Sequence, residues 1–172
     1  SDRHRYGLWR RMWLALAEAE AEMGLPIAAS QLDQMRRHLD TIDFAKAAAF
    51  ERQTRHDVFA HLHTFGEDCP EAKPIMHLGA TSAYVTDNTD LFLIRESLDL
   101  ATARLATVVE RLASKARETK SIICLGRTHL QPAQPTTIGK RICLWILDLL
   151  LDLEELHHRR AHLCARGVKG TT

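Results

Sequence analysis

A histidine that could transfer a proton lies in the most irregular part of this sequence. His129 falls within Gly126–Thr137, where Pro132 and Pro135 interrupt two long helical patterns. A histidine held between two helix ends can have a pKa near neutrality and can give or take a proton. A histidine in a loop can also simply be exposed. The interpretation of His129 therefore depends on whether other parts of the chain could complete a site.

A second polar break, Thr54–Asp57, places a cation, an imidazole and a carboxylate side by side. At the start of a helix, Arg55 and the free backbone N–H groups could bind an anionic group, with His56 and Asp57 beside it. The alternative is that Asp57 only caps the helix and that its charged neighbours face solvent.

A third break, His77–Ser82, contains a glycine and the hydroxyl groups of Thr81 and Ser82. Together with free backbone N–H groups, such a loop can surround a carboxylate or a phosphate. The alternative is an ordinary loop in which Ser82 or Asp87 caps the next helix. Three histidine-containing breaks in one helical chain predict a single composite site.

Helices must position these breaks. The 8 glycines and 5 prolines cluster at a few places, which favours long uninterrupted helices. Before residue 78 we expect four helices. The first ends at Met23, with an apolar stripe through Leu8, Met12, Ala15 or Leu16, and Ala19. The second is capped by Ser30 and runs through Leu39, the third is capped by Asp43 and runs to about Gln53, and the fourth runs from about His56 to Phe65. The predicted fold class is all-α, with a small N-terminal helical domain over residues 1–78.

Two much longer helices follow. Apolar residues recur at steps of three and four over about 87–120 and again over about 136–166. The first helix would be roughly 50 Å long. The second also has apolar residues outside its main stripe, which is expected to contain Ile142, Trp145, Leu149, Leu153 and Leu156. Residues 79–172 are therefore predicted to be part of a central long-helix bundle domain that several chains build together.

The composition excludes several classes of protein. A net charge of +1 gives no basic face for nucleic acid, and no apolar run approaches the ~18 residues of a membrane span. Four widely separated cysteines are typical of reduced thiols in a cytoplasmic protein. The sequence starts at Ser1 without methionine and stops at Gly170–Thr172, so we expect it to be a piece of a longer chain.

The three breaks and their flanks resemble the fumarase/aspartase superfamily and, within it, the adenylosuccinate lyase family. The first signature region matches Arg55–Val58 and His77–Ser82, and the second matches Gly126–Pro132. Further matching segments are Leu14–Glu20, Gly24–Ile27, His61–Phe65 and Gly167–Thr172. The family's third signature, a serine-rich loop ending in Met-Pro-x-Lys-x-Asn, does not occur in this sequence. Its extreme N-terminus and C-terminal domain do not occur here either.

The resemblance implies a lyase of purine biosynthesis. Such an enzyme cleaves adenylosuccinate to AMP and fumarate, and the related succinyl-aminoimidazole ribotide in the same way, by β-elimination without a metal or organic cofactor. The family forms homotetramers in which subunits share active sites. Because the implied base is a serine of the missing loop, we expect these 172 residues alone to be inactive.

The resemblance also implies a role for each residue of the breaks. His129 is the general acid. His56 is the second catalytic histidine, and it orients substrate groups together with His77. The other implied substrate-binding residues are Arg55 and Asp57, which contact the nucleotide, and Thr81, Ser82 and Thr128, which bind carboxylate or phosphate.

Two alternatives stay open at this point. One is another superfamily lyase, such as argininosuccinate lyase or fumarase; Arg55–Asp57 and the Thr81–Ser82 context favour the purine substrate. The other is a non-catalytic helical oligomerisation fragment, which the presence of Thr128 and His129 disfavours. The length of the first long helix further predicts that the Arg55–Asp57 and Thr81–Ser82 segments lie close within one chain, whereas His129 approaches them from a neighbouring subunit.

Overall fold

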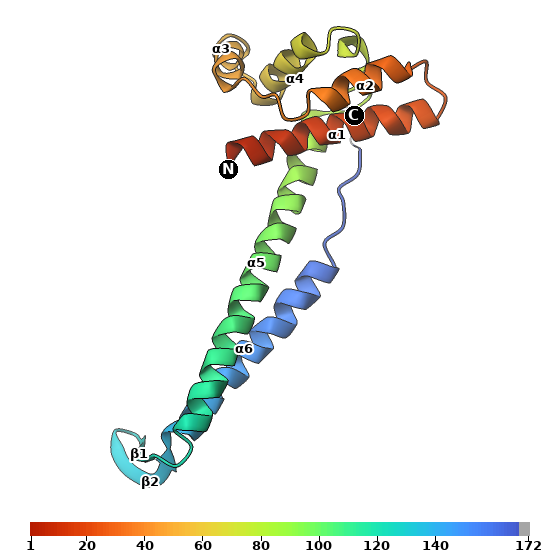
Figure 1. The fold of residues 1–172 in the computed structure, drawn as a ribbon. Coiled ribbons are helices and arrows are strands. Elements are labelled where there is room, and N and C mark those ends of the chain that lie inside the picture. Colours follow the sequence, from red (N-terminus) through yellow and green to blue (C-terminus); the bar gives the residue numbers. More distant parts are fainter. Residues whose placement is uncertain (169–172) are drawn as a thin grey trace. The chain divides into compact units, whose positions relative to one another are not determined.

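The computed structural model describes residues 1–168 and has the all-α fold class that the sequence predicts (Figure 1). Its helices are α1 (Asp2–Glu22), α2 (Ala29–Arg37), α3 (Phe44–Thr54), α4 (Asp57–Asp68), α5 (Ser82–Glu118) and α6 (Ile138–Ala161), with a short 3-10 helix, η1 (Lys73–Ile75). Two strands, β1 (Ile123–Thr128) and β2 (Gln131–Thr137), form a small antiparallel sheet. Of the matching Gly167–Thr172 segment, only Gly167 and Val168 lie within the described residues.

The chain divides into two compact units. The first comprises residues 1–93 and 164–168, and the second comprises residues 94–163. The predicted division into domains at residues 78 and 79 stays a prediction.

The helix ends show which capping predictions were correct. Asp43 caps α3, and its carboxylate accepts a backbone N–H of the first turn at 3.0 Å. The prediction that Ser30 caps α2 was wrong, because the helix already begins at Ala29. Instead, the side chain of Gln31, in the first turn of α2, accepts the backbone N–H of Ala28 at 2.9 Å. This hydrogen bond satisfies the backbone donor of the residue that precedes the helix.

The segment between the two long helices is a β-hairpin, whereas the sequence led us to expect irregular backbone. Thr128 and Gln131 form the last pair of the ladder, and the register shifts between Leu125 and Arg127. The two residues at the tip, His129 and Leu130, have φ angles of 49° and 63°. Two consecutive positive φ angles are typical of the tight two-residue turn that matches the twist of a hairpin.

Two tryptophans of α1 dominate the core of the first unit. Trp9 and Trp13 are 2% and 0% exposed, and Trp13 stacks on Phe65 of α4 with ring centroids 6.2 Å apart. Of the predicted apolar stripe, Leu16 is buried, whereas Leu8 and Met12 are only half-buried and Ala19 is exposed. In the first half of α1 the core face therefore lies one position after the predicted one, because the larger rings of Trp9 and Trp13 occupy the interior.

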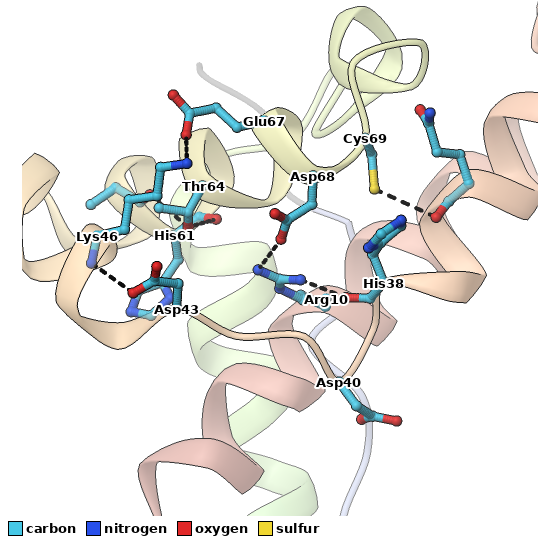
Figure 2. A network of polar contacts seen from close by, with 12 residues as sticks. Arg10, His38, Asp40, Asp43, Lys46, His61, Thr64, Glu67, Asp68 and Cys69 are labelled. Atoms are coloured by element: carbon cyan, nitrogen blue, oxygen red, sulfur yellow. Dashed lines mark hydrogen bonds and ion pairs between the residues drawn. The ribbon is translucent and has the colours of Figure 1, made fainter.

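A buried cation lies next to these rings. Figure 2 shows Arg10 with its polar partners Asp68 and His38. Arg10 is 2% exposed, forms an ion pair with Asp68 at 3.2 Å, and donates a hydrogen bond to the backbone carbonyl of His38. Its guanidinium also lies 4.4 Å from the ring centroid of Phe65. Burial lowers the pKa of Arg10 and Asp68 opposes that shift. Arg10 thus joins α1 to the last residue of α4 and to the turn after α2.

His61 of α4 is a core histidine. It is 6% exposed, stacks on Tyr6 with centroids 3.7 Å apart, and meets the edge of Trp9 at 5.6 Å. Burial and, secondarily, the charge of Arg10 lower the pKa of His61 from 6.5 to about 4. The imidazole is therefore neutral in the folded protein at neutral pH.

This shift predicts acid sensitivity. Between pH 6.5 and about 4, the unfolded chain binds a proton at His61 that the folded chain does not, so the folded state loses stability as the pH falls. The free energy of unfolding should fall by ~1.4 kcal/mol per pH unit in this window because of His61 alone. Urea unfolding followed by tryptophan fluorescence measures the slope. His61→Phe, which keeps an aromatic ring, should remove that part of the slope; an unchanged slope would contradict the assignment.

In the second unit α6 runs alongside α5 (Figure 1). The less exposed residues of α6 recur at steps of four and three, as in a helix pair with one shared seam: Ile142, Ile146, Leu149, Leu153 and Leu156. Trp145 was predicted to belong to this seam, but it is 55% exposed and Ile146 takes its place.

Gly139 allows the backbones of α6 and α5 to come close. A Cβ atom at this position would lie 2.4 Å from the carbonyl oxygen of Ala116 and 2.8 Å from the Cα of Lys120. The Gly139 N–H donates to the carbonyl of Thr119 at 3.2 Å, so the first turn of α6 is bonded to the end of α5. A methyl group has no room there unless the backbone moves.

We therefore predict that Gly139→Ala destabilises the protein by about 1–3 kcal/mol, the usual range for overpacking. Gly7→Ala in α1 is the matched control, since a Cβ at Gly7 meets no atom within 4 Å. That substitution should leave stability unchanged or raise it by up to about 1 kcal/mol, through helix propensity. Thermal unfolding of both variants measures the difference. Equal melting temperatures for the two variants would show that the close approach at Gly139 does not limit the size of the side chain there.

Candidate active site

Four of the site residues predicted from the sequence line one pocket in the first unit. The pocket has a volume of about 190 Å³, and His56, His77, Thr81 and Ser82 form its polar wall. The apolar wall consists of Val58, Phe59, Leu62 and Ala80. The structure thus brings the Thr54–Asp57 and His77–Ser82 breaks together.

His56 connects these two breaks. It is the N-cap of α4, and its Nδ1 accepts the backbone N–H of Phe59 at 3.2 Å. Because Nδ1 acts as an acceptor, the ring proton of neutral His56 lies on Nε2, which is 3.3 Å from the hydroxyl oxygen of Ser82. The Ser82 oxygen then accepts from His56, and its own O–H is free to donate to a ligand. Asp57, the alternative cap, is instead the first residue of the helix.

His77 is held by the core of the unit. The indole N–H of Trp13 donates to its Nδ1 at 3.1 Å, and the two rings meet edge to face with centroids 6.2 Å apart. Burial lowers the pKa of His77, and the proximity of His56 lowers it further. The neutral ring therefore carries its proton on Nε2, while the ring itself forms part of the pocket wall.

Unusual backbone geometry coincides with the three predicted breaks. Within residues 1–168, the non-glycine residues with positive φ are Arg55, His77, His129 and Leu130, at 56°, 62°, 49° and 63°. A non-glycine residue in this region costs roughly 1–2 kcal/mol. Such strain persists where the surrounding structure fixes it, and it is frequent at functional sites. The sequence could not show this, because none of the four positions is glycine.

Two predicted site residues in the same break lie outside the pocket. The side chain of Arg55 borders a neighbouring open groove with Glu51 and Arg52. Asp57 is exposed, and its carboxylate accepts the backbone N–H of Val58 at 2.8 Å. Both side chains could reach a ligand that extends out of the pocket, but neither lines it.

Thr128 and His129 belong to the second unit. Thr128 ends β1, and His129 is exposed at the tip of the hairpin. Thr137 caps α6 from the other end of the hairpin by accepting the N–H of Lys140 at 3.1 Å. The approach of His129 to the pocket of another subunit stays a prediction.

Sequence reasoning missed the residues that support the pocket. Trp13 is spaced along α1 as a core residue is, and nothing local shows that its indole reaches His77. Phe59 was also missed. The available sequence signal was a large aromatic residue three positions after His56, and the structure adds that this side chain is 50% exposed.

Comparison with known proteins shows which family the chain belongs to. A family model described as "Lyase" matches residues 3–172, and the chain belongs to this lyase family. It is 50% identical over 170 residues to an adenylosuccinate lyase from Schistosoma mansoni and 51% identical over 175 residues to one from Saccharomyces cerevisiae. The alignments cover 98% and 100% of this chain and 35% and 36% of those proteins, so the chain spans about a third of the length of the curated relatives it matches.

The fold also matches a solved structure. The β-carboxy-cis,cis-muconate cycloisomerase from Acinetobacter calcoaceticus superposes with a TM-score of 0.84 at 24% identity, over 99% of this chain and 41% of that one. At this identity the match establishes the fold alone. None of the helices within residues 1–168 has the combined length and hydropathy of a membrane-spanning segment.

Proposed function

We propose that the full-length protein is a C–N lyase that cleaves adenylosuccinate to AMP and fumarate by β-elimination. It acts in the same way on succinyl-aminoimidazole ribotide, so it serves purine biosynthesis. The observation that carries this proposal is the pocket in which His56, His77, Thr81 and Ser82 converge from two separate breaks. The identity of about half to the two adenylosuccinate lyases supports the choice of substrate.

The polar wall of the pocket suits the charge that develops in such a reaction. Removal of a proton from the succinyl carbon next to a carboxylate delocalises a second negative charge into that carboxylate. The hydroxyl groups of Thr81 and Ser82 and the Nε2–H of His77 supply donors at fixed positions, which stabilise this charge more effectively than mobile water does. His56 keeps Ser82 oriented through the 3.3 Å contact.

His129 serves as the general acid and protonates the departing nitrogen. The tight turn exposes its ring at the hairpin tip, where a substrate held by another element can reach it. The base that removes the succinyl proton lies outside these 172 residues, in a region corresponding to the serine-rich loop of the family. Proton transfer by two side chains requires no metal or organic cofactor.

The second unit supports assembly into a homotetramer with shared sites. On α6 the side chains of Leu144, Trp145, Leu147, Leu150 and Leu151 are 43–56% exposed. An apolar face of this kind, opposite the seam with α5, is typical of a helix that packs against other chains. We place the protein in the cytoplasm, in accordance with its free cysteines at residues 69, 124, 143 and 164.

The role of His129 predicts a specific kinetic defect. His129→Ala in the full-length enzyme should lower kcat for adenylosuccinate by about 10²–10⁴-fold, the usual contribution of a general acid, while KM changes little. A steady-state assay of fumarate release measures both constants. His157→Ala, which alters an exposed histidine of α6, is the control and should retain normal rates. A His129→Ala enzyme with a near-normal kcat would contradict the assignment.

The proposed assembly predicts that charge on the apolar face of α6 separates the subunits. Leu147→Glu together with Leu151→Glu should convert the tetramer into smaller species, because a buried unpaired carboxylate is strongly unfavourable. Light scattering after size-exclusion chromatography gives the molar mass. His157→Glu adds charge at an exposed polar position of the same helix and should leave the tetramer intact. A tetramer that tolerates both leucine substitutions would exclude this face from the interface.

A further inference from the structure

The hydrogen bond between Trp13 and His77 connects the core to the pocket. The indole Nε1 and the imidazole Nδ1 are 3.1 Å apart, and Trp13 is 0% exposed. An indole N–H is only a donor, so the Nδ1 atom that receives it must present a lone pair. This interaction is lost if His77 takes up a second proton, and it is equally lost if the ring proton moves from Nε2 to Nδ1.

We propose that Trp13 is a positioning residue that holds His77 as a neutral ring with its proton on Nε2, so that this N–H donates to a carboxylate of the succinyl group. This inference rests on the proposed function, because it takes the substrate from it. His77 itself adopts a left-handed backbone conformation, with a φ of 62°. Trp13 therefore selects one of the three protonation forms of the imidazole.

A neutral donor suits this reaction better than a cation does. A charged imidazole would already bind the carboxylate strongly in the ground state, whereas catalysis needs interactions that strengthen as charge develops. Neutral imidazole serves as a hydrogen-bond donor of this kind in other enzymes. The Nε2–H of His77 can also act together with the hydroxyl of Ser82, which lines the same pocket.

The chain contains a matched control for the indole N–H. Trp9 lies on the same face of α1 and is 2% exposed, yet its Nε1 has no hydrogen-bond partner. Tryptophan to phenylalanine removes similar volume at both positions. Only at Trp13 does it also remove a hydrogen bond.

The first test is spectroscopic and uses the full-length protein labelled with ¹⁵N-histidine. The ring nitrogens of His77, assigned by their loss in His77→Gln, should show an unprotonated Nδ1 and a protonated Nε2. In Trp13→Phe the two nitrogens should shift toward values averaged over several forms, whereas Trp9→Phe should leave them unchanged. A protonated Nδ1 in the unsubstituted protein overturns the proposal, whether or not the variant folds.

The second test is kinetic. Trp13→Phe should lower kcat for adenylosuccinate about 5-fold, the effect of losing one oriented hydrogen bond that strengthens as charge develops, with KM changed less than about 2-fold. Trp9→Phe should change neither constant. Identical kinetics for the two variants would refute the role of Trp13. Failure of the unsubstituted protein to cleave adenylosuccinate would instead refute the proposed function, while the nitrogen spectra would still decide the role of Trp13.

Discussion

The buried guanidinium of Arg10 fixes the packing on which the pocket depends. It lies between α1 and α4 at 2% exposure and forms an ion pair with Asp68, the last residue of α4. Because the Asp68 side chain is 30% exposed and the guanidinium is almost fully buried, moving α1 along α4 would leave the cation buried without its carboxylate, which is unfavourable. One turn further along α1, Trp13 reaches His77, and α4 itself begins after its cap, His56. The ion pair at one end of α4 therefore holds the elements that place two histidines in the pocket.

The pocket combines rigid supports with strained connections. Arg55 and His77 adopt left-handed backbone conformations at the ends of the two breaks, and each break is tied to a helix or to the core. His56 supports both breaks, since it caps α4 and its ring contacts the hydroxyl of Ser82. The same principle applies in the second unit, where His129 lies on a strained two-residue turn between two paired strands. Arg55 is the left-handed C-cap of α3, and His129 and Leu130 form the two-residue turn of the hairpin, so at these positions the positive φ angles end one element and connect two strands.

The sequence predicted the helices because apolar spacing and the scarcity of glycine and proline are local signals. It also predicted which polar breaks contain the pocket residues. It did not predict the hairpin, because Pro132 and Pro135 disfavour strands except at sheet edges, and a two-stranded sheet consists only of edges. The burial of Arg10 was not predicted. Charged residues are almost never fully buried without a partner, and the partner of Arg10, Asp68, lies 58 positions away in the sequence. For the same reason no local pattern could pair Trp13 with His77, which are separated by 64 positions.

The central proposal is that a lyase site is completed when His129 of one subunit meets the pocket of another. Intersubunit complementation tests it most directly. Full-length His129→Ala and Ser82→Ala proteins, each inactive on adenylosuccinate, are co-expressed so that mixed tetramers form. If the two residues come from different chains, random mixing leaves about a quarter of the sites with both residues intact, and activity returns to about that fraction. Mixed tetramers that stay as inactive as either parent would show that both residues of a site belong to one chain, and would contradict the account.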